Sequence, residues 1–315
     1  MGRFRAPTLA PCLVLATAGL LTAFQDTIIR TEVRLVPLLV TVKDPAGNLV
    51  GDLGKSEFKV FDNNVEQEIS VFEHRTEQPL SVSLLVDVSG STAKDLKYET
   101  DSTAKFLKTL LREGNTNDQA SLYSFDGDVA LQCSFTRRIA RLEDKLKTIR
   151  GEGGTSLYDA VVFGSRDLEG RSGRHVMIVI TDGGDTTSHW TYQDAIRSLH
   201  RADTAVYAIL VVPITNGAGR NIGGENALTQ MTRDTGGRVF TPNLGPGLDQ
   251  AFSDILRELR TQYLIGYYPK NIPPSPERFH RVRVEPQRRA GLQVFTRSGY
   301  YGTKEESAGL KSGRE

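Results

Sequence analysis

VSLLVDVSGS, residues 82–91, is a short apolar run that ends in an aspartate and two alternate serines. An apolar run of this length predicts a strand buried on both faces, as in a parallel sheet with helices on either side. Residues just beyond the carboxyl end of such a strand lie in the crevice where open α/β sheets bind ligands. Asp87, Ser89 and Ser91 would therefore present three oxygen-bearing side chains from one turn. Oxygen ligands suit a hard cation such as Mg²⁺, Mn²⁺ or Ca²⁺.

From residue 80 to about 262, apolar strand patterns alternate with helical patterns. The expected strands are residues 82–88, 119–125, 128–135, 175–181, 206–212 and 238–241. The expected helices are residues 95–112, 139–149, 156–168, 191–202, 225–234 and 247–262. An Asp126-Gly127 turn joins the second and third strands as a hairpin. This order predicts a doubly wound, mostly parallel α/β sheet with one antiparallel edge.

Both flanks of this α/β region have strand patterns without helical period. Short strands are expected at residues 32–42, 58–61 and 69–72 before it and at 263–268, 279–284 and 292–297 after it. Three such strands cannot close a core alone, so the two sets are expected to form one small β-sandwich, residues 26–76 and 263–301. The α/β domain, residues 80–262, would be inserted into that sandwich. The polar tail, residues 303–315, is expected to be disordered.

The N-terminus has the composition of a secretory signal peptide. Arg3 and Arg5 precede an uncharged run, residues 6–24, with small residues near its end. Cleavage near Ala23 is expected, which predicts a secreted, periplasmic or cell-envelope protein. The alternative is an uncleaved membrane anchor, but Pro7 and Pro11 and a modest hydrophobicity weigh against a stable span. The mature form is therefore expected to have no membrane span.

Composition excludes several classes of function. The chain has 315 residues and 38% hydrophobic content, enough to bury the cores of two domains. Its net charge of +1 gives no electrostatic case for binding nucleic acid or an anionic membrane. Of two cysteines, Cys12 lies in the signal segment, so Cys133 alone remains and no intrachain disulfide is expected.

Two further loops are expected to join the turn after residue 87. GEGGTSLYDA, residues 151–160, is a glycine-rich loop that meets a helix start and offers the hydroxyl of Thr155. VITDGGD, residues 179–185, is a buried strand that ends at Asp182. If that strand lies beside residues 82–88, Asp182 arrives next to Asp87. Two carboxylates and three hydroxyls would then hold a cation with one position open for a carboxylate of a partner.

This constellation resembles the von Willebrand factor type A domain and its metal-ion-dependent adhesion site, with the pattern D-x-S-x-S … T … D. The matching residues are Asp87, Ser89, Ser91, Thr155 and Asp182, and the likeness extends over residues 80–262. The flanks VTVKDPAGNLVGDLGKSEFKVFDN and YLIGYYP…RVRV…SGYY resemble the VWFA-related family of bacterial exported proteins named after Acidobacteria.

The resemblance implies an exported adhesion or protein-binding module with Mg²⁺, or Mn²⁺ or Ca²⁺, at this site. It implies direct coordination by Ser89 and Ser91, coordination by Thr155 directly or through water, and carboxylates that act largely through water. The partner would be a protein that offers an acidic side chain. Five residues would support the loops rather than bind the metal: Gly90, Gly154, Asp159, Gly183 and Asp185.

Three alternatives compete with this interpretation. Aspartate and serine after a strand are also common helix caps. The metal could have a closed coordination shell and only stabilise an exported domain. The third alternative is a metal-dependent hydrolase. A phosphatase of the haloacid dehalogenase type, one such enzyme, needs a second acidic residue at the position that Ser89 occupies. A serine hydrolase needs an activating base, and only His189 lies on a loop near Asp182. We therefore expect no catalytic residues and no enzymatic activity.

Overall fold

The computed structural model describes residues 34–74, 77–90, 92, 96–211, 222–243, 246–273, 278–287 and 289–302. The predicted signal peptide, residues 1–23, the tail, residues 303–315, and Ser91 lie outside the described residues. The described residues belong to one compact unit.

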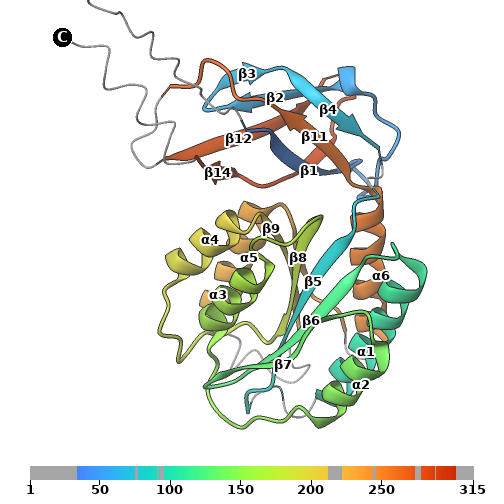
Figure 1. The fold of residues 1–315 in the computed structure, drawn as a ribbon, viewed down its shortest axis with the longest axis vertical. Coiled ribbons are helices and arrows are strands. Elements are labelled where there is room, and N and C mark those ends of the chain that lie inside the picture. The colour runs from blue at the N-terminus through green and yellow to red at the C-terminus, as the bar shows by residue number, and fades with distance from the viewer. Residues whose placement is uncertain are drawn as a thin grey trace, which may run out of the picture. The chain divides into compact units, whose positions relative to one another are not determined.

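A six-stranded sheet in the order β10-β9-β8-β5-β6-β7 forms the centre of the α/β domain (Figure 1). Its strands are β5 (Leu80–Asp87), β6 (Gln119–Phe125), β7 (Val129–Thr136), β8 (Arg174–Thr181), β9 (Thr204–Leu210) and β10 (Val239–Phe240). All neighbours pair in parallel except β6 and β7, which form an antiparallel hairpin. Every residue of β5, β8 and β9 is buried, as the mostly apolar runs predict. The doubly wound α/β fold class is therefore confirmed.

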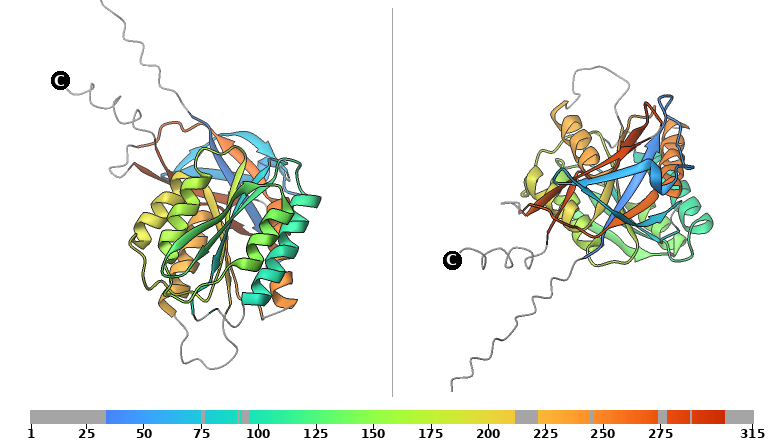
Figure 2. Two further views of the ribbon diagram at one scale, coloured as in Figure 1. Left: turned by 60° about the horizontal axis from the view of Figure 1, so that its bottom comes forward. Right: turned by 90° about the horizontal axis from the view of Figure 1, so that it is seen from above.

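In the described part of the chain, six helices cover the two faces of this sheet (Figures 1 and 2). One face carries α1 (Leu96–Glu113), α2 (Ile139–Thr148) and α6 (Pro246–Thr261). The other carries α3 (Leu157–Leu168), α4 (Tyr192–Arg201) and α5 (Ile222–Thr235). Alternate side chains of a strand point to opposite faces, so Leu84 and Val86 pack toward α1 and α6, whereas Leu85 packs toward α3.

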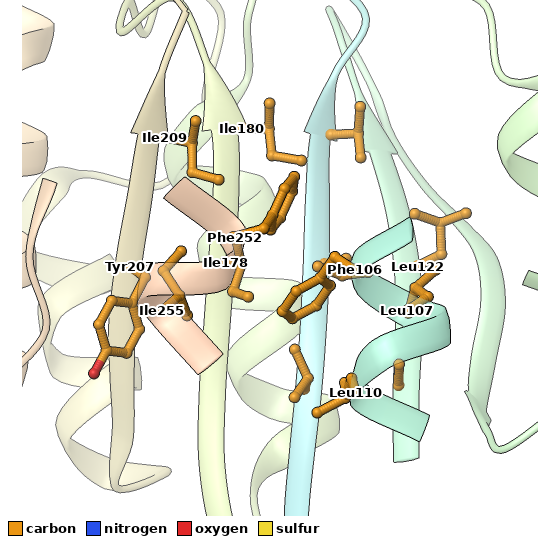
Figure 3. Close-up of a cluster of buried hydrophobic side chains, with 14 of the residues drawn as sticks. Phe106, Leu107, Leu110, Leu122, Ile178, Ile180, Tyr207, Ile209, Phe252 and Ile255 are labelled. Carbon is orange, nitrogen blue, oxygen red and sulfur yellow. The ribbon is translucent and has the colours of Figure 1, made fainter. Parts of the chain in front are cut away.

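Aromatic and branched aliphatic side chains fill the core beneath α1 and α6 (Figure 3). Phe106 of α1 stacks on Phe252 of α6 with ring centroids 4.8 Å apart, and both rings are buried. Ile178 and Ile180 of β8 line the same cluster from the sheet. Full burial of each such side chain contributes about 1.5–3 kcal/mol, so this core fixes both helices on the sheet.

Two four-stranded antiparallel sheets form the β-sandwich, in the orders β13-β1-β11-β4 and β14-β12-β2-β3. The N-terminal elements are β1 (Val36–Lys43), the 3-10 helix η1 (Lys55–Glu57), β2 (Phe58–Asp62), β3 (Val65–Gln67) and β4 (Ile69–Glu73). The C-terminal strands are β11 (Tyr263–Tyr267), β12 (Phe279–Pro286), β13 (Gln293–Phe295) and β14 (Gly299–Tyr301).

Each sheet of the sandwich combines strands from both ends of the chain. In one, β1 pairs with β11, with Leu38 opposite Ile265. In the other, β2 pairs with β12, with Val60 opposite Val284. A sandwich of N- and C-terminal strands around an inserted α/β domain agrees with the expected fold class, whereas the exact domain boundaries stay a prediction. The three-residue strands β3 and β14 were not expected from the sequence.

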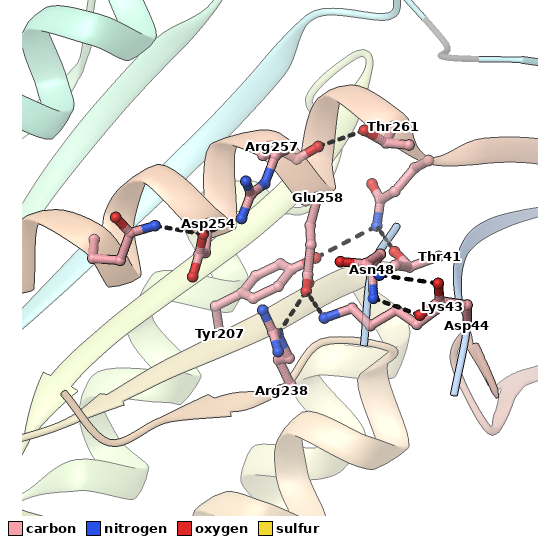
Figure 4. A network of polar contacts seen from close by, with 12 residues as sticks. Thr41, Lys43, Asp44, Asn48, Tyr207, Arg238, Asp254, Arg257, Glu258 and Thr261 are labelled. Atoms are coloured by element: carbon pink, nitrogen blue, oxygen red, sulfur yellow. Dashed lines mark hydrogen bonds and ion pairs between the residues drawn. The ribbon is translucent and has the colours of Figure 1, made fainter. Parts of the chain in front are cut away.

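The last turns of α6 are bound to the sandwich and to the central sheet by a buried ion cluster (Figure 4). Lys43 of β1 donates to Glu258 of α6, and both side chains are almost fully buried. Arg238, just before β10, approaches the same Glu258 carboxylate at 2.6 Å. Nearby, Arg174 at the start of β8 donates to the Leu259 carbonyl oxygen. We call this region the sandwich-facing end of the α/β domain.

Two findings bear on the sequence-based expectations about export. Among the described residues, no helix combines the length and apolar character needed to cross a membrane. Cys133 is a free thiol buried in β7.

Candidate functional site

The carboxylate of Asp87, the last residue of β5, is held at the carboxyl edge of the central sheet. The residue is 0% exposed. Thr181, the last residue of the neighbouring strand β8, donates its hydroxyl to Asp87 Oδ2 at 2.6 Å. The backbone N–H of Ser89 donates to Asp87 Oδ1 at 2.9 Å. Both carboxylate oxygens are therefore fixed by the turn and the adjacent strand, and neither caps a helix.

Burial raises the pKa of Asp87 to about 6, although hydrogen bonds from Ser89 and Thr181 act in the opposite direction. The carboxylate of Asp182 raises the pKa further, which places the two acids within electrostatic range of each other. A buried carboxylate beside a second one is costly to ionise. A cation placed between them would lower that cost.

Ser89 is buried in a tight turn that leads toward α1. Thr92 closes this turn: its backbone N–H donates to the Ser89 carbonyl oxygen at 3.1 Å, and its hydroxyl donates to the carbonyl oxygens of Asp87 and Ser89. The carbonyl oxygen of Thr92 then accepts from the N–H of Leu96, where α1 begins. The D-x-S part of the motif is thus a fixed turn at the end of β5.

The glycine-rich loop before α3 packs against this turn and against the loop after β8. Gly90 donates its N–H to the Gly153 carbonyl oxygen at 3.4 Å. Thr155 is 6% exposed, and its N–H donates to Thr186 Oγ1 at 2.8 Å. A Cβ on Gly154 would lie 2.7 Å from Thr187 Cγ2, closer than such atoms approach. A residue with a side chain at position 154 would therefore force the side chains of Thr186 and Thr187 to move.

Asp182 is half-buried and follows β8 directly. The next residue, Gly183, has φ +101°, a conformation that side chains other than glycine rarely adopt. Its N–H donates to Thr181 Oγ1 at 3.1 Å. The hydroxyl of Thr181 therefore links the Asp87 carboxylate to the turn that carries Asp182.

Asp159 and Asp185 attach the loop after β8 to the first turn of α3. Asp185 Oδ1 accepts from the N–H of Tyr158 at 3.2 Å. Asp159 accepts from the N–H of Trp190 at 2.8 Å and lies 3.0 Å from His189 Nδ1. Burial alone would raise the pKa of Asp159, but the hydrogen bonds from Trp190 and His189 outweigh it and lower that pKa. In the structure both carboxylates hold loops in place.

Three residues organise the site that sequence reasoning did not assign to it. Thr181 orients Asp87, and Thr186 holds Thr155 through its hydroxyl and through its N–H, which donates to the Thr155 carbonyl oxygen at 2.8 Å. Asp126, assigned to a hairpin turn, accepts from the N–H groups of Glu152 and Gly153 at 3.2 and 3.4 Å. The position of Thr181, directly before Asp182 at a strand end, is the one signal that pointed to such a role.

Among the described residues, no group of three or more histidine, cysteine, aspartate and glutamate side chains is placed to hold a metal ion. The residues that the structure brings together are Asp87, Ser89 and Asp182, with the Thr155 loop fastened to the turns that carry them. Any cation here would depend on hydroxyl ligands as well as carboxylates.

These features define a doubly wound α/β domain that gathers hydroxyls and carboxylates at the carboxyl ends of β5 and β8. The sequence matches the model of the von Willebrand factor type A domain over residues 81–252, more than half of the chain, and the protein therefore belongs to this family. Domains of this family commonly mediate protein–protein interactions.

Several solved structures are similar to this chain at low sequence identity. BatB from Bacteroides thetaiotaomicron is 18% identical, with 57% of this chain and 98% of BatB covered and a TM-score of 0.46. The PilB minor pilin from Streptococcus sanguinis is 13% identical, with 59% and 62% covered and a TM-score of 0.45. The VWA domain of SpRpn10 is 11% identical, with 56% and 95% covered and a TM-score of 0.44. No curated protein matches the sequence. Likenesses this distant carry no argument about function.

Proposed function

We propose that the protein is an exported, metal-dependent protein-binding module. In this proposal Ser89, Ser91 and Thr155 provide hydroxyl ligands to a divalent cation, and Asp87 and Asp182 act largely through water. A carboxylate of a partner protein completes the coordination. Mg²⁺ is the expected ion, with Mn²⁺ and Ca²⁺ as chemically similar substitutes.

The observation that carries the proposal is the environment of Asp87. Its carboxylate is fully buried, its pKa is raised to about 6 by burial, and its neighbours include a second carboxylate, that of Asp182. Among the described residues, the other groups that act on it are two hydroxyls and a backbone N–H, all of them hydrogen-bond donors. The oxygen atoms of these hydroxyls and carboxylates fit a hard cation, because such ions bind oxygen ligands with negative charges nearby.

The choice of a binding role over an enzymatic one follows from the same residues. Neutral hydroxyl ligands leave a divalent ion electron-poor, and an electron-poor ion attracts an additional carboxylate. His189, the histidine near Asp182, has its Nδ1 at Asp159 Oδ2 rather than at a serine hydroxyl. Membership of a family whose domains commonly bind proteins supports the same conclusion. Secretion or location in the cell envelope rests on the composition of residues 1–23.

A titration of the purified protein with Mn²⁺, followed by calorimetry, tests the metal. We expect one site, and we expect Ser89→Ala to weaken it about tenfold or more, as changes around a metal commonly do. The matched control is Ser83→Ala, which removes an equally buried hydroxyl from β5, one that contacts Ser121 instead. Equal affinity in all three proteins, or no binding, would refute the proposal.

Water-proton relaxation of the Mn²⁺ complex distinguishes the open site from a purely stabilising metal. An open position holds a rapidly exchanging water, so relaxation should be enhanced and should fall when acetate, the simplest carboxylate, displaces that water. A closed shell gives little enhancement and no response to acetate. That second result would favour a structural exported domain over a binding module.

A further inference from the structure

The outer edge of β7 has no neighbouring strand among the described residues. β7 is the last strand of the central sheet, and within the described part of the chain it forms ladder pairs only with β6. Its sequence, VALQCSFT, contains no charged residue and no proline, two of the features that prevent edge-to-edge pairing, although the strand is bulged twice against β6. Leu131 in the middle of the strand is 49% exposed. The strand therefore offers the outer edge of residues 129–136, interrupted by two bulges, to another strand.

Opposite charges mark the two ends of this edge. Asp128 precedes β7 and Arg138 follows it, and both are exposed. Among the described residues neither side chain has a hydrogen-bond or ion-pair partner: the bonds of Asp128 and Arg138 involve only their backbone atoms. Arg137, by contrast, points inward and donates to the carbonyl oxygens of Leu111, Asn115 and Asp118. One free acid and one free base therefore lie ten residues apart along a single edge.

We propose that β7 pairs antiparallel with β7 of a second copy of this chain. About a two-fold axis, an antiparallel pair sets the start of each strand against the end of the other. The pairing that brings Asp128, in the turn before β7, toward Arg138, the N-cap residue of α2, of the second copy does so twice, once at each end. The same pairing places Leu131 opposite Phe135 of the second copy and puts Cys133 on the axis.

The chemistry of the edge favours a second copy over an unrelated strand. Residues opposite each other in an antiparallel pair share a face of the sheet, so each exposed Leu131 is covered by Phe135 of the second copy. Phe135 is already ordered in each copy, because the guanidinium of Arg171 lies 3.8 Å from its ring centroid. A foreign strand would satisfy the backbone groups, but it would need its own acid and base at matching positions.

Two consequences follow for the assembly. The β6–β7 ladder has register shifts between Ala120 and Tyr123, and the resulting twist limits the number of bonds across the new interface. We therefore expect a weak, concentration-dependent dimer.

The turn before β7 adjoins the candidate metal site through Asp126, so antiparallel pairing directs the two sites away from each other. The dimer would be bivalent, able to hold two partners at opposite ends.

Sedimentation velocity of the purified protein over a range of concentrations, with EDTA present, tests this proposal. We expect a reversible dimer. Asp128→Arg or Arg138→Asp alone turns both cross-strand pairs into like-charge pairs and should weaken association about tenfold. The double variant restores opposite charges and should recover wild-type association. Leu131→Lys, which places a charge at the centre of the edge, should abolish it.

The controls separate the edge from general effects of charge. Asp101→Arg makes the same change of net charge on the exposed face of α1 and should leave association unchanged. Ser89→Ala should dimerise as the wild type does, because the pairing needs no metal. A protein that stays monomeric at all concentrations would overturn the proposal. So would a dimer that ignores Leu131→Lys, or single reversals that the double variant fails to restore, provided that thermal unfolding shows each variant folded.

Discussion

At the carboxyl edge of the α/β domain, the buried carboxylate of Asp87 is surrounded by hydroxyls, a backbone N–H and the carboxylate of Asp182. At the sandwich-facing end, the equally buried Glu258 lies between Lys43 and Arg238 (Figure 4). One acid is balanced by cations that the chain itself brings from a distant strand. Asp87, by contrast, has among the described residues neutral hydrogen-bond donors and the carboxylate of Asp182 around it.

This difference distinguishes a cluster that stabilises the fold from a site that can bind a ligand. A buried ion cluster closed within the chain holds two structural parts in one arrangement, and its loss leaves unbalanced charge. A buried acid that the described part of the chain leaves unbalanced, as it does Asp87, favours a cation from outside. The following predictions test this contrast.

The largest effect is expected at the closed cluster. Glu258→Gln leaves Lys43 buried without a negative partner, so the free energy of unfolding should fall by about 3–5 kcal/mol. Urea unfolding measures the loss. Adding Lys43→Met removes the orphaned charge and should recover part of the stability. Mn²⁺ affinity should not change, and a parallel fall in affinity would mean that the two ends are not independent.

A second effect is expected when the pH is lowered, because the buried His200 then takes up a proton. Burial, and secondarily Arg297, lowers the pKa of His200 to about 4, while Asp234 and Asp203 act weakly in the opposite direction. The unfolded chain binds a proton on this residue at higher pH than the native protein does. Its contribution to stability is therefore complete above about pH 6.5 and is lost as the pH falls toward 4, by up to about 3 kcal/mol.

The matched variant for this acid effect is His200→Gln, which cannot titrate. Relative to that variant, the wild type should lose stability between pH 6.5 and 4 in chemical unfolding. Parallel pH profiles for the two proteins would contradict the assignment. The subtraction matters because other groups, Asp87 among them, titrate in the same range.

A smaller effect is expected at the open site. Thr181→Ala removes a 2.6 Å hydrogen bond to the Asp87 carboxylate, and a hydrogen bond to a charged group contributes about 1.5–3 kcal/mol. Unlike Glu258→Gln, this variant should also weaken Mn²⁺ binding, because the carboxylate loses its fixed orientation. Thr181→Ser keeps the hydroxyl and should restore both properties. Unchanged Mn²⁺ affinity in Thr181→Ala would show that Asp87 does not act at the site.

The smallest effect is expected from an ion pair outside both ends. Lys59 and Glu66 lie 3.1 Å apart on the sandwich surface, and both side chains are largely exposed. Glu66→Gln should change the free energy of unfolding by less than about 1 kcal/mol. A loss as large as that of Glu258→Gln would mean that burial is not what distinguishes the sandwich-facing cluster.

The sequence predicts most of the α/β domain because its pattern is local. Strands β5, β8 and β9 are mostly apolar, and mostly apolar runs occur where both faces of a strand are covered. The adjacency of Asp87 and Asp182 was conditional on two of these strands being neighbours. β8 does pair with β5 in parallel, with Ile180 opposite Val86, and this brings the two aspartates to one edge.

The remainder depends on contacts that no local pattern contains. Strands β3 and β14 are three residues long, too short for a periodicity, and exist through pairing with β2 and β12. Lys43 and Glu258 are separated by 215 positions in the chain. The bond from Thr181 to Asp87 likewise joins residues 94 positions apart. The ligand roles of the site residues stay predictions for the same reason, since they need the ion itself.

The shared sandwich has a consequence for the order in which the chain folds. β1 and β2 leave the ribosome early, but their neighbours β11 and β12 are synthesised after the whole α/β domain. The inserted domain can bury its own core first. Until β11 and β12 are synthesised, β1 and β2 have unpaired edges, and unpaired edges promote misassembly. A chain that stops before Tyr263 would keep the inserted domain, but the edges of β1 and β2 would stay unpaired. In this protein the strands between residues 263 and 301 therefore complete the sheets that the strands between residues 36 and 73 begin.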